Sequence, residues 1–176
     1  MRIQDRLDAV RADITTLSVD AIVNAANTGL IPGGGVDGAI RRAAGPELTE
    51  ETEKIGGCPT GGAVMTGGYA LPAKHVIHTA APVWAGGDRE DVQASLLGSC
   101  YTSALRLADK HRIHTIAFPA IGTGIYGWPP ERAANIAFGA AVRHLATGGK
   151  QTKVIFCCFN DADRARYQAL IDALTD

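Results

Sequence analysis

The chain has 176 residues, of which 46% are hydrophobic and 20% are charged, as expected for a folded globular protein rather than a disordered one. This length suits one domain, and we expect residues 1–176 to form it. The formal net charge of −1 at pH 7 provides no global positive field, so neither nucleic acid nor a membrane surface is expected as a partner.

Strand-like and helix-like segments alternate along the chain, and the most regular helical periodicity covers residues 91–111. Strands are predicted at residues 6–12, 21–25, 63–66, 74–80, 114–121 and 154–159. Helices are predicted at residues 35–44, 46–55, 91–111, 131–146 and 161–174. Alternation of this kind indicates an α/β fold, in which helices cover both faces of a largely parallel sheet.

Local signals mark the starts of three of these helices. Residues 46–55 are acidic in their first turn, where the helix dipole favours negative charge. Pro130 suits the first turn of the helix that follows it. Asp161 is expected to cap the last helix.

The N-terminal stretch MRIQDRLDAV lacks the apolar run of a signal peptide, and no apolar segment approaches membrane-spanning length. We therefore expect a cytoplasmic protein. The four cysteines, Cys58, Cys100, Cys157 and Cys158, form no C-x-x-C pair and no ligand spacing with the histidines. They are interpreted as buried free thiols, with Cys157 and Cys158 on opposite faces of a strand, and no metal site is expected.

A first glycine-rich loop, Gly33-Gly34-Gly35-Val36-Asp37-Gly38, formally satisfies G-x-G-x-x-G. As a dinucleotide fingerprint it is misplaced, because residues 27–32 separate it from the preceding strand. A flexible surface loop would explain the glycines but not the helix that opens directly after them. The chain also has no G-K-[ST] ending, which excludes P-loop kinases and NTPases.

A second loop, Gly122-Thr123-Gly124-Ile125-Tyr126-Gly127, repeats the glycine spacing, follows an apolar strand directly and leads into a helix. The carboxyl ends of parallel strands meet at one ligand crevice. Two glycine loops at that edge, each ahead of a helix, can hold one anion through their backbone N–H groups. The pattern favours a diphosphate ligand.

Polar and aromatic residues follow the predicted strands. Asp13 can accept a hydrogen bond from an exocyclic amine such as that of adenine, although a turn or cap role is the simpler alternative. Asn24 and Asn27 bracket a strand end, and at least one of them is expected to contact ligand hydroxyls. Tyr126 offers a ring to a sugar and a hydroxyl to a phosphate, whereas Phe159 fits base stacking and core packing equally well.

The usual hydrolytic machinery is missing. The serines lack a G-x-S-x-G elbow. None of the five histidines lies within a glycine loop, so the sequence gives no local support to a histidine base. Most are interpreted as surface or core-edge residues, and only His78, in VIHTAAP, is kept as a candidate.

The motifs ADIT, NAAN, GGGVDGAI, GCPTGGA, AFPAIGTGIYG and VIFCCF occur in this order over nearly the whole chain. Together they resemble the macrodomain family, and more narrowly its MacroD type, which includes bacterial O-acetyl-ADP-ribose deacetylases. The resemblance implies a three-layer α/β/α fold with a mixed, largely parallel central sheet, and an ADP-ribose site at the carboxyl ends of the strands.

The resemblance also implies roles for individual residues. Asp13 would bond the adenine amine beside the Ile14 backbone, Asn27 would bond the distal ribose, and Asp37 would be the catalytic base. The residues implied to bind ADP-ribose are Asp13, Ile14, Asn27, Gly35, Val36, Asp37, Gly122, Thr123, Gly124, Ile125, Tyr126, Phe159 and Asn160. Many relatives have serine at the position of Gly122, so a hydroxyl donor to phosphate is expected to be absent here, with Thr123 and backbone amides compensating.

The implied reactions are ester hydrolyses at the distal ribose: deacetylation of O-acetyl-ADP-ribose and removal of mono-ADP-ribose from protein Glu or Asp. Neither requires a cofactor, a metal or a covalent nucleophile, because Asp37 and Asn27 would act on water and ribose directly. A non-catalytic reader of ADP-ribose is the alternative, whereas an RNA-linked regulator has no support in charge or motif. The protein is expected to be a monomer.

Overall fold

The computed structural model describes residues 1–175, over which six strands form one sheet in the order β1-β6-β5-β2-β4-β3. The strands are β1 (Leu7–Arg11), β2 (Ala21–Ala26), β3 (Ala63–Gly67), β4 (His75–Ala80), β5 (Thr115–Phe118) and β6 (Lys153–Cys158). Every neighbouring pair is parallel except β3 and β4, which are antiparallel. The prediction of a mixed, largely parallel sheet is confirmed.

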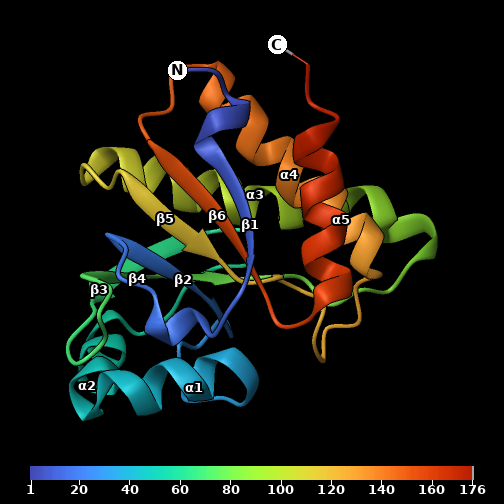
Figure 1. Cartoon of the computed structure of the whole chain (residues 1–176). Coiled ribbons are helices and arrows are strands. Elements are labelled where there is room, and N and C mark those ends of the chain that lie inside the picture. Colours follow the sequence, from blue (N-terminus) through green and yellow to red (C-terminus); the bar gives the residue numbers. More distant parts are fainter. Residues whose placement is uncertain (176) are drawn as a thin grey trace.

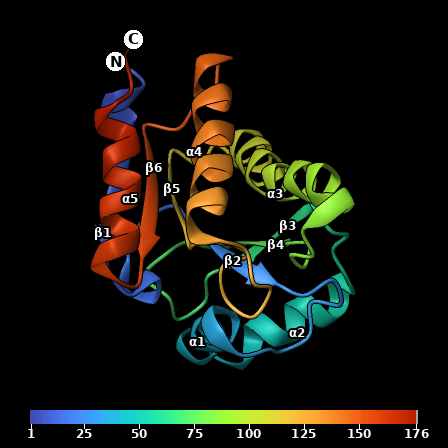
Figure 2. The same ribbon diagram turned by 90° about the vertical axis from the view of Figure 1, so that its right-hand side faces the viewer.

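Helices cover both faces of this sheet (Figures 1 and 2). The helices are α1 (Gly35–Ala44), α2 (Pro46–Ile55), α3 (Glu90–Lys110), α4 (Pro130–Ala146) and α5 (Asp161–Asp172). Helices α1 and α2 lie below the sheet in Figure 1, and α3, α4 and α5 lie on its other face. The three-layer α/β/α architecture is therefore as predicted.

Each face of the sheet has its own apolar core. The larger core packs α3, α4 and α5 against the sheet and includes Phe118, Phe156 and Tyr167, the last two with stacked rings 4.5 Å apart. The smaller core lies under α1 and α2. Cys157 belongs to the smaller core and Cys158 to the larger one, as predicted for neighbours on a strand.

Two local predictions were wrong. Asp161 does not cap α5, because the Asn160 side chain accepts the hydrogen bond from the Asp163 N–H at 2.8 Å. Asp161 is instead the first residue of the helix, and its carboxylate pairs with Arg11 across 3.1 Å. The strand predicted over residues 114–121 ends at Phe118, since Pro119 lacks the N–H that continued sheet pairing requires.

No helix within residues 1–175 combines the length and the apolar character that a membrane crossing requires.

Candidate functional site

The candidate site lies at the carboxyl edge of the sheet, where four neighbouring strands end. Strands β1, β6, β5 and β2 are mutually parallel in that order, so the segments after them emerge on the same edge. Asp13 follows β1, Asn27 follows β2, Gly122 begins the loop after β5, and Phe159 follows β6. The predicted site residues are therefore brought to one edge, although their contacts with a ligand stay predictions.

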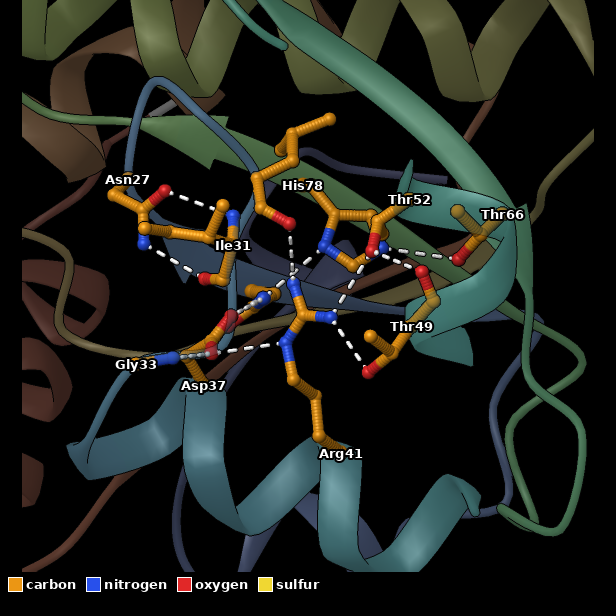
Figure 3. Close-up of polar contacts among 11 residues, drawn as sticks. Asn27, Ile31, Gly33, Asp37, Arg41, Thr49, Thr52, Thr66 and His78 are labelled. Carbon is orange, nitrogen blue, oxygen red and sulfur yellow. Dashed lines mark hydrogen bonds and ion pairs between the residues drawn. The ribbon is translucent and has the colours of Figure 1, made fainter. Parts of the chain in front are cut away.

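The first glycine loop lies between β2 and α1 and is shaped by hydrogen bonds within the chain (Figure 3). The Asn27 side chain accepts from the Ile31 N–H at 3.0 Å and donates to the Ile31 carbonyl at 2.8 Å, which closes a tight turn. Gly34 precedes α1 without a side-chain cap, and it and Gly35 are exposed. The start of α1 is therefore exposed and has no side-chain cap, and anion binding there stays a prediction.

Asp37 lies in the first turn of α1 and is almost fully buried. Its Oδ1 accepts from the Asn24 side chain at 2.7 Å, and its Oδ2 accepts from the Gly33 N–H at 2.7 Å and from Arg41 Nε at 3.0 Å (Figure 3). A carboxylate offers about four acceptor positions. These three hydrogen bonds leave one, on Oδ1, for a further donor.

Arg41 is also buried and joins three segments of the chain. Besides the ion pair with Asp37, its guanidinium donates to the Leu30 carbonyl and to the hydroxyls of Thr49 and Thr52 on α2, each at 3.0 Å. Five donors in a planar fork allow this arrangement, which a lysine could not reproduce. Arg41 therefore fixes Asp37 relative to the Asn27–Ile31 turn and α2.

His78, on β4, completes the network from the opposite side of Asn24. Its Nδ1 lies 3.1 Å from Asn24 Nδ2, which can only donate, so the imidazole proton sits on Nε2 and is donated to Thr66 Oγ1 at 3.0 Å. Burial and, to a smaller extent, the charge of Arg41 together lower the pKa of His78 to about 4. His78 is therefore a neutral, buried anchor for Asn24 and not a base facing solvent.

These contacts revise the sequence interpretation of Asp37. It was expected to be the catalytic base beside the distal ribose, with no partner in the chain assigned to it, but it has a cationic partner within its own helix and donors on both oxygens. Arg41 was not among the predicted site residues. The signal was available, because Asp37 and Arg41 have the i,i+4 spacing that pairs opposite charges on one helix face.

The second glycine loop is held by Trp128. Gly122 has φ +86°, and a Cβ atom added there would lie 2.7 Å from Trp128 Cδ1, while the Trp128 N–H donates to the Gly122 carbonyl at 3.0 Å. The absence of a serine hydroxyl at this position thus has a structural reason in this chain. The Thr123 hydroxyl does not replace it as a free donor, because it bonds the Ala120 carbonyl at 2.9 Å.

A second tryptophan ties this loop to the segment after β4. The Trp84 N–H donates to the Tyr126 carbonyl at 2.8 Å, and the Trp128 indole donates to the Pro82 carbonyl at 2.9 Å. The two indole rings lie 4.9 Å apart. In contrast, Gly124 and Ile125 at the tip of the loop are exposed, which leaves their backbone available to a ligand.

The far end of the edge carries Asp13 and Phe159. Asp13 Oδ1 accepts from the Thr15 hydroxyl at 2.7 Å and from the Thr15 N–H at 3.0 Å, and the first of these bonds lowers the pKa of Asp13. The cap role considered for Asp13 is therefore present. Phe159 is 69% exposed, so the core alternative is wrong for this side chain.

The cysteines are free and buried, as predicted. Burial raises the pKa of each thiol, to about 11 for Cys157 and about 12 for Cys158. Protonated, buried thiols are poor nucleophiles. Over residues 1–175, the structure also contains no group of three His, Cys, Asp or Glu residues arranged to hold a metal ion.

Comparison with known proteins agrees with this geometry. The Macro domain family model matches residues 23–137. A macro domain-containing protein of Chlorobaculum tepidum is 56% identical over 167 residues, which cover 95% of this chain and 96% of the relative. The chain therefore belongs to the macrodomain family.

Two relatives have names that state an activity. The O-acetyl-ADP-ribose deacetylase of Enterobacter cloacae subsp. cloacae is 48% identical over 170 residues, covering 94% of this chain and 93% of that protein. The ADP-ribose glycohydrolase MACROD2 of Xenopus laevis is 50% identical over 165 residues, covering 93% of this chain and 39% of that protein.

Solved macrodomain structures share the fold. The Oceanobacillus iheyensis macrodomain with ADP has a TM-score of 0.90 and 38% identity, covering 99% of this chain and 96% of that one. The Trypanosoma brucei macrodomain in complex with ADP-ribose has a TM-score of 0.87 and 40% identity, covering 94% of this chain and 69% of that one.

Proposed function

We propose that this protein binds ADP-ribose and hydrolyses an ester at its distal ribose. The observation that carries the proposal is that two glycine loops, each ahead of a helix, follow the adjacent parallel strands β2 and β5, and that Asn27 and Asp37 flank the first of them. A Cβ atom added at Gly33 would lie 3.6 Å from Asp37 Oδ2 and 3.7 Å from Asn27 Nδ2, so both side chains flank this glycine. The names of the relatives and the ligands of the solved neighbours support the same assignment.

The ligand would run along the carboxyl edge of the sheet. The adenine would lie between Asp13 and Phe159, with the Ile14 backbone and Asn160 nearby, and Asp13 Oδ2 would accept from its amine. The N–H groups at the start of α1 and in the second glycine loop would hold the diphosphate. The distal ribose would then lie at Asn27, next to Asp37.

The chemistry requires only water and the residues already described. The free acceptor position of Asp37 Oδ1 would orient a water molecule toward the ester carbonyl. The water oxygen forms a bond to the carbonyl carbon, the ester C–O bond breaks, and the proton lost by the water ends on the departing ribose oxygen, which becomes a hydroxyl. Arg41, Asn24 and Gly33 N–H hold the carboxylate rigidly, so positioning is its main contribution.

A reader that binds ADP-ribose without hydrolysis is the second candidate. One observation favours it: the chain's own donors occupy three acceptor positions of Asp37, which gives the carboxylate a structural role that needs no reaction. Both candidates share the binding site and differ only in turnover.

The two candidates are separated by assaying wild-type protein on O-acetyl-ADP-ribose and on a protein mono-ADP-ribosylated on glutamate, with ADP-ribose affinity measured by calorimetry. The proposal expects turnover of at least one ester, and a loss of about 100-fold or more in Asp37→Ala. Thermal unfolding of this variant shows whether it is folded. The exposed Glu53→Ala variant on α2 is the matched control.

Asn27→Ala tests the assigned site independently of Asp37, because Asn27 is not part of the buried Asp37–Arg41 ion pair. Binding of ADP-ribose by a wild type that hydrolyses neither ester would establish the reader instead. Turnover by Asp37→Ala at the wild-type rate would refute the assigned role of the carboxylate.

A further inference from the structure

A hollow of about 600 Å³ lies beside the start of α3, outside the proposed ADP-ribose site. The residues that form it are Thr60, Pro82, Val83, Arg89, Val92 and Leu96, together with Asp88 and Gln93. Val83 and Val92 are 57% and 64% exposed, which is unusual for two branched apolar side chains lining the same depression.

The order of the strands places this hollow at one end of the proposed ligand. Across the carboxyl edge, the adenine is assigned to β1 and β6, the diphosphate to the loops after β5 and β2, and the distal ribose to Asn27 at the end of β2. The next strand in the sheet is β4, paired with β2 through Ala26 and Ala80. A group attached beyond the distal ribose would therefore continue over the end of β4, from which Pro82 and Val83 follow.

The segment around Thr60 approaches the same place. Thr60 forms a β-bridge with Ala80, and the Cys58 N–H donates to the Thr28 carbonyl at 2.8 Å, one residue after Asn27. Adjacent strands are about 4.8 Å apart. The hollow therefore begins within about two strand spacings of the turn assigned to the distal ribose.

The wall of the hollow is held in place by the chain itself. Pro82 accepts from the Trp128 indole, Trp84 donates to the Tyr126 carbonyl, and the Ala85 N–H donates to Gln93 Oε1 at 3.1 Å. Val83 thus lies on a segment held at both ends, and Val92 lies on the first turn of α3. Binding to a pre-formed surface of this kind requires little ordering of the protein, so little conformational entropy is lost.

The chemistry of the lining suits a polypeptide. Apolar side chains line it together with the exposed charges of Asp88 and Arg89. A polypeptide supplies apolar, polar and charged groups together, whereas an acetyl group is far too small to fill about 600 Å³. A second nucleotide would require backbone donors or several cations for its phosphates.

We propose that this hollow receives the polypeptide that flanks an ADP-ribosylated glutamate or aspartate. The proposal rests on the proposed function for the direction of the ADP-ribose, and it deepens that function by selecting protein-linked ADP-ribose over O-acetyl-ADP-ribose as the substrate for which the surface is built. Contacts at the hollow add to those with ADP-ribose, so a modified protein gains affinity that free ADP-ribose lacks.

The test compares Val83→Glu and Val92→Glu with wild type on two esters: a protein mono-ADP-ribosylated on glutamate, and O-acetyl-ADP-ribose. We expect kcat/KM for the modified protein to fall about tenfold, because a charge replaces an apolar contact, while kcat/KM for O-acetyl-ADP-ribose stays within about twofold. Ile55→Glu, an exposed apolar residue at the end of α2, is the matched control and should change neither.

Equal losses on both esters, or no loss on either, would overturn the proposal. Affinity measurements distinguish failure of this proposal from failure of the proposed function. If wild type hydrolyses neither ester, the proposed function fails, and the hollow is tested by affinity alone. The proposal then expects wild type to bind the modified protein more tightly than free ADP-ribose, and both glutamate variants to abolish the difference; equal affinities in wild type would refute it.

Discussion

Arg41 and Asp37 form an ion pair of 3.0 Å, one turn apart on α1, with side chains only 7% and 5% exposed. The Asp37 carboxylate also accepts a hydrogen bond from Asn24, which is held in place by His78. The Arg41 guanidinium also donates a hydrogen bond to Thr52 on α2. The polar centre of the candidate site is thus part of the protein interior. Changes to any member are expected to affect stability as well as activity.

Removing the Arg41 guanidinium should destabilise the folded protein. Arg41→Ala leaves Asp37 buried without its charged partner, and we expect the free energy of unfolding to fall by about 3–5 kcal/mol. Urea denaturation measures the change. Arg42→Ala, at the exposed next position, is the control and should cost about 0.5 kcal/mol or less. A similar small effect for both variants would mean that the ion pair is not important for stability.

Stability should fall in mild acid because of His78. The unfolded chain protonates this residue near pH 6.5, whereas the folded chain does so only near pH 4, so the unfolded state binds more protons between these values. Arg41 faces the imidazole and opposes its charge, while Asp37 and Glu51 favour it. The resulting loss is about 3 kcal/mol in total as pH falls from 6.5 to 4.

The pH dependence is measured by denaturant unfolding of wild type and His78→Gln at pH 7, 5.5 and 4. Acidic residues contribute to both proteins, so the difference between the two curves isolates the histidine. Parallel curves for the two proteins would show that His78 is not the group responsible.

Introducing a side chain at Gly122 should strain the second loop. In Gly122→Ser the new Cβ atom would lie 2.7 Å from Trp128 at a φ of +86°, and we expect a loss of about 1–3 kcal/mol. Gly124→Ser, where no atom lies within 4 Å of an added Cβ, is the control. Equal thermal stability of the two variants would contradict the assigned role of Trp128.

Ligand binding should change the intrinsic fluorescence. The only tryptophans of the sequence, Trp84 and Trp128, both contact the segment that carries the second glycine loop. Titration with ADP-ribose should therefore change the emission with the same Kd that calorimetry gives. In Trp84→Phe the remaining signal should report on Trp128 alone. An emission spectrum that stays constant at saturating ligand would indicate binding away from this loop.

Most of the fold is readable from the sequence. Alternating periodicities, Pro130 and the glycine breaks located the helices within about two residues and gave the sheet its largely parallel character. The short strand β5 was predicted too long, because HTIAFPAI is apolar throughout and apolarity alone does not show where Pro119 ends sheet pairing. Asn160 and Asp161 are both good capping residues, and only the backbone conformation decides between them.

The candidate site could be predicted from the sequence less completely than the fold. Local sequence determined the two glycine loops and the residues beside them, since backbone N–H groups at a helix start are a property of consecutive residues. Arg41 pairs with Asp37 through an i,i+4 spacing on α1, which the sequence contains. Tertiary structure decided the other contacts, because Asn24 on β2 reaches Asp37, and His78 on β4 reaches Asn24, only in the folded chain. Whether a buried carboxylate is free or bonded depends on which donors the fold brings within about 3 Å of it, and spacing along the chain specifies such a distance within one helix but not between separate strands and helices.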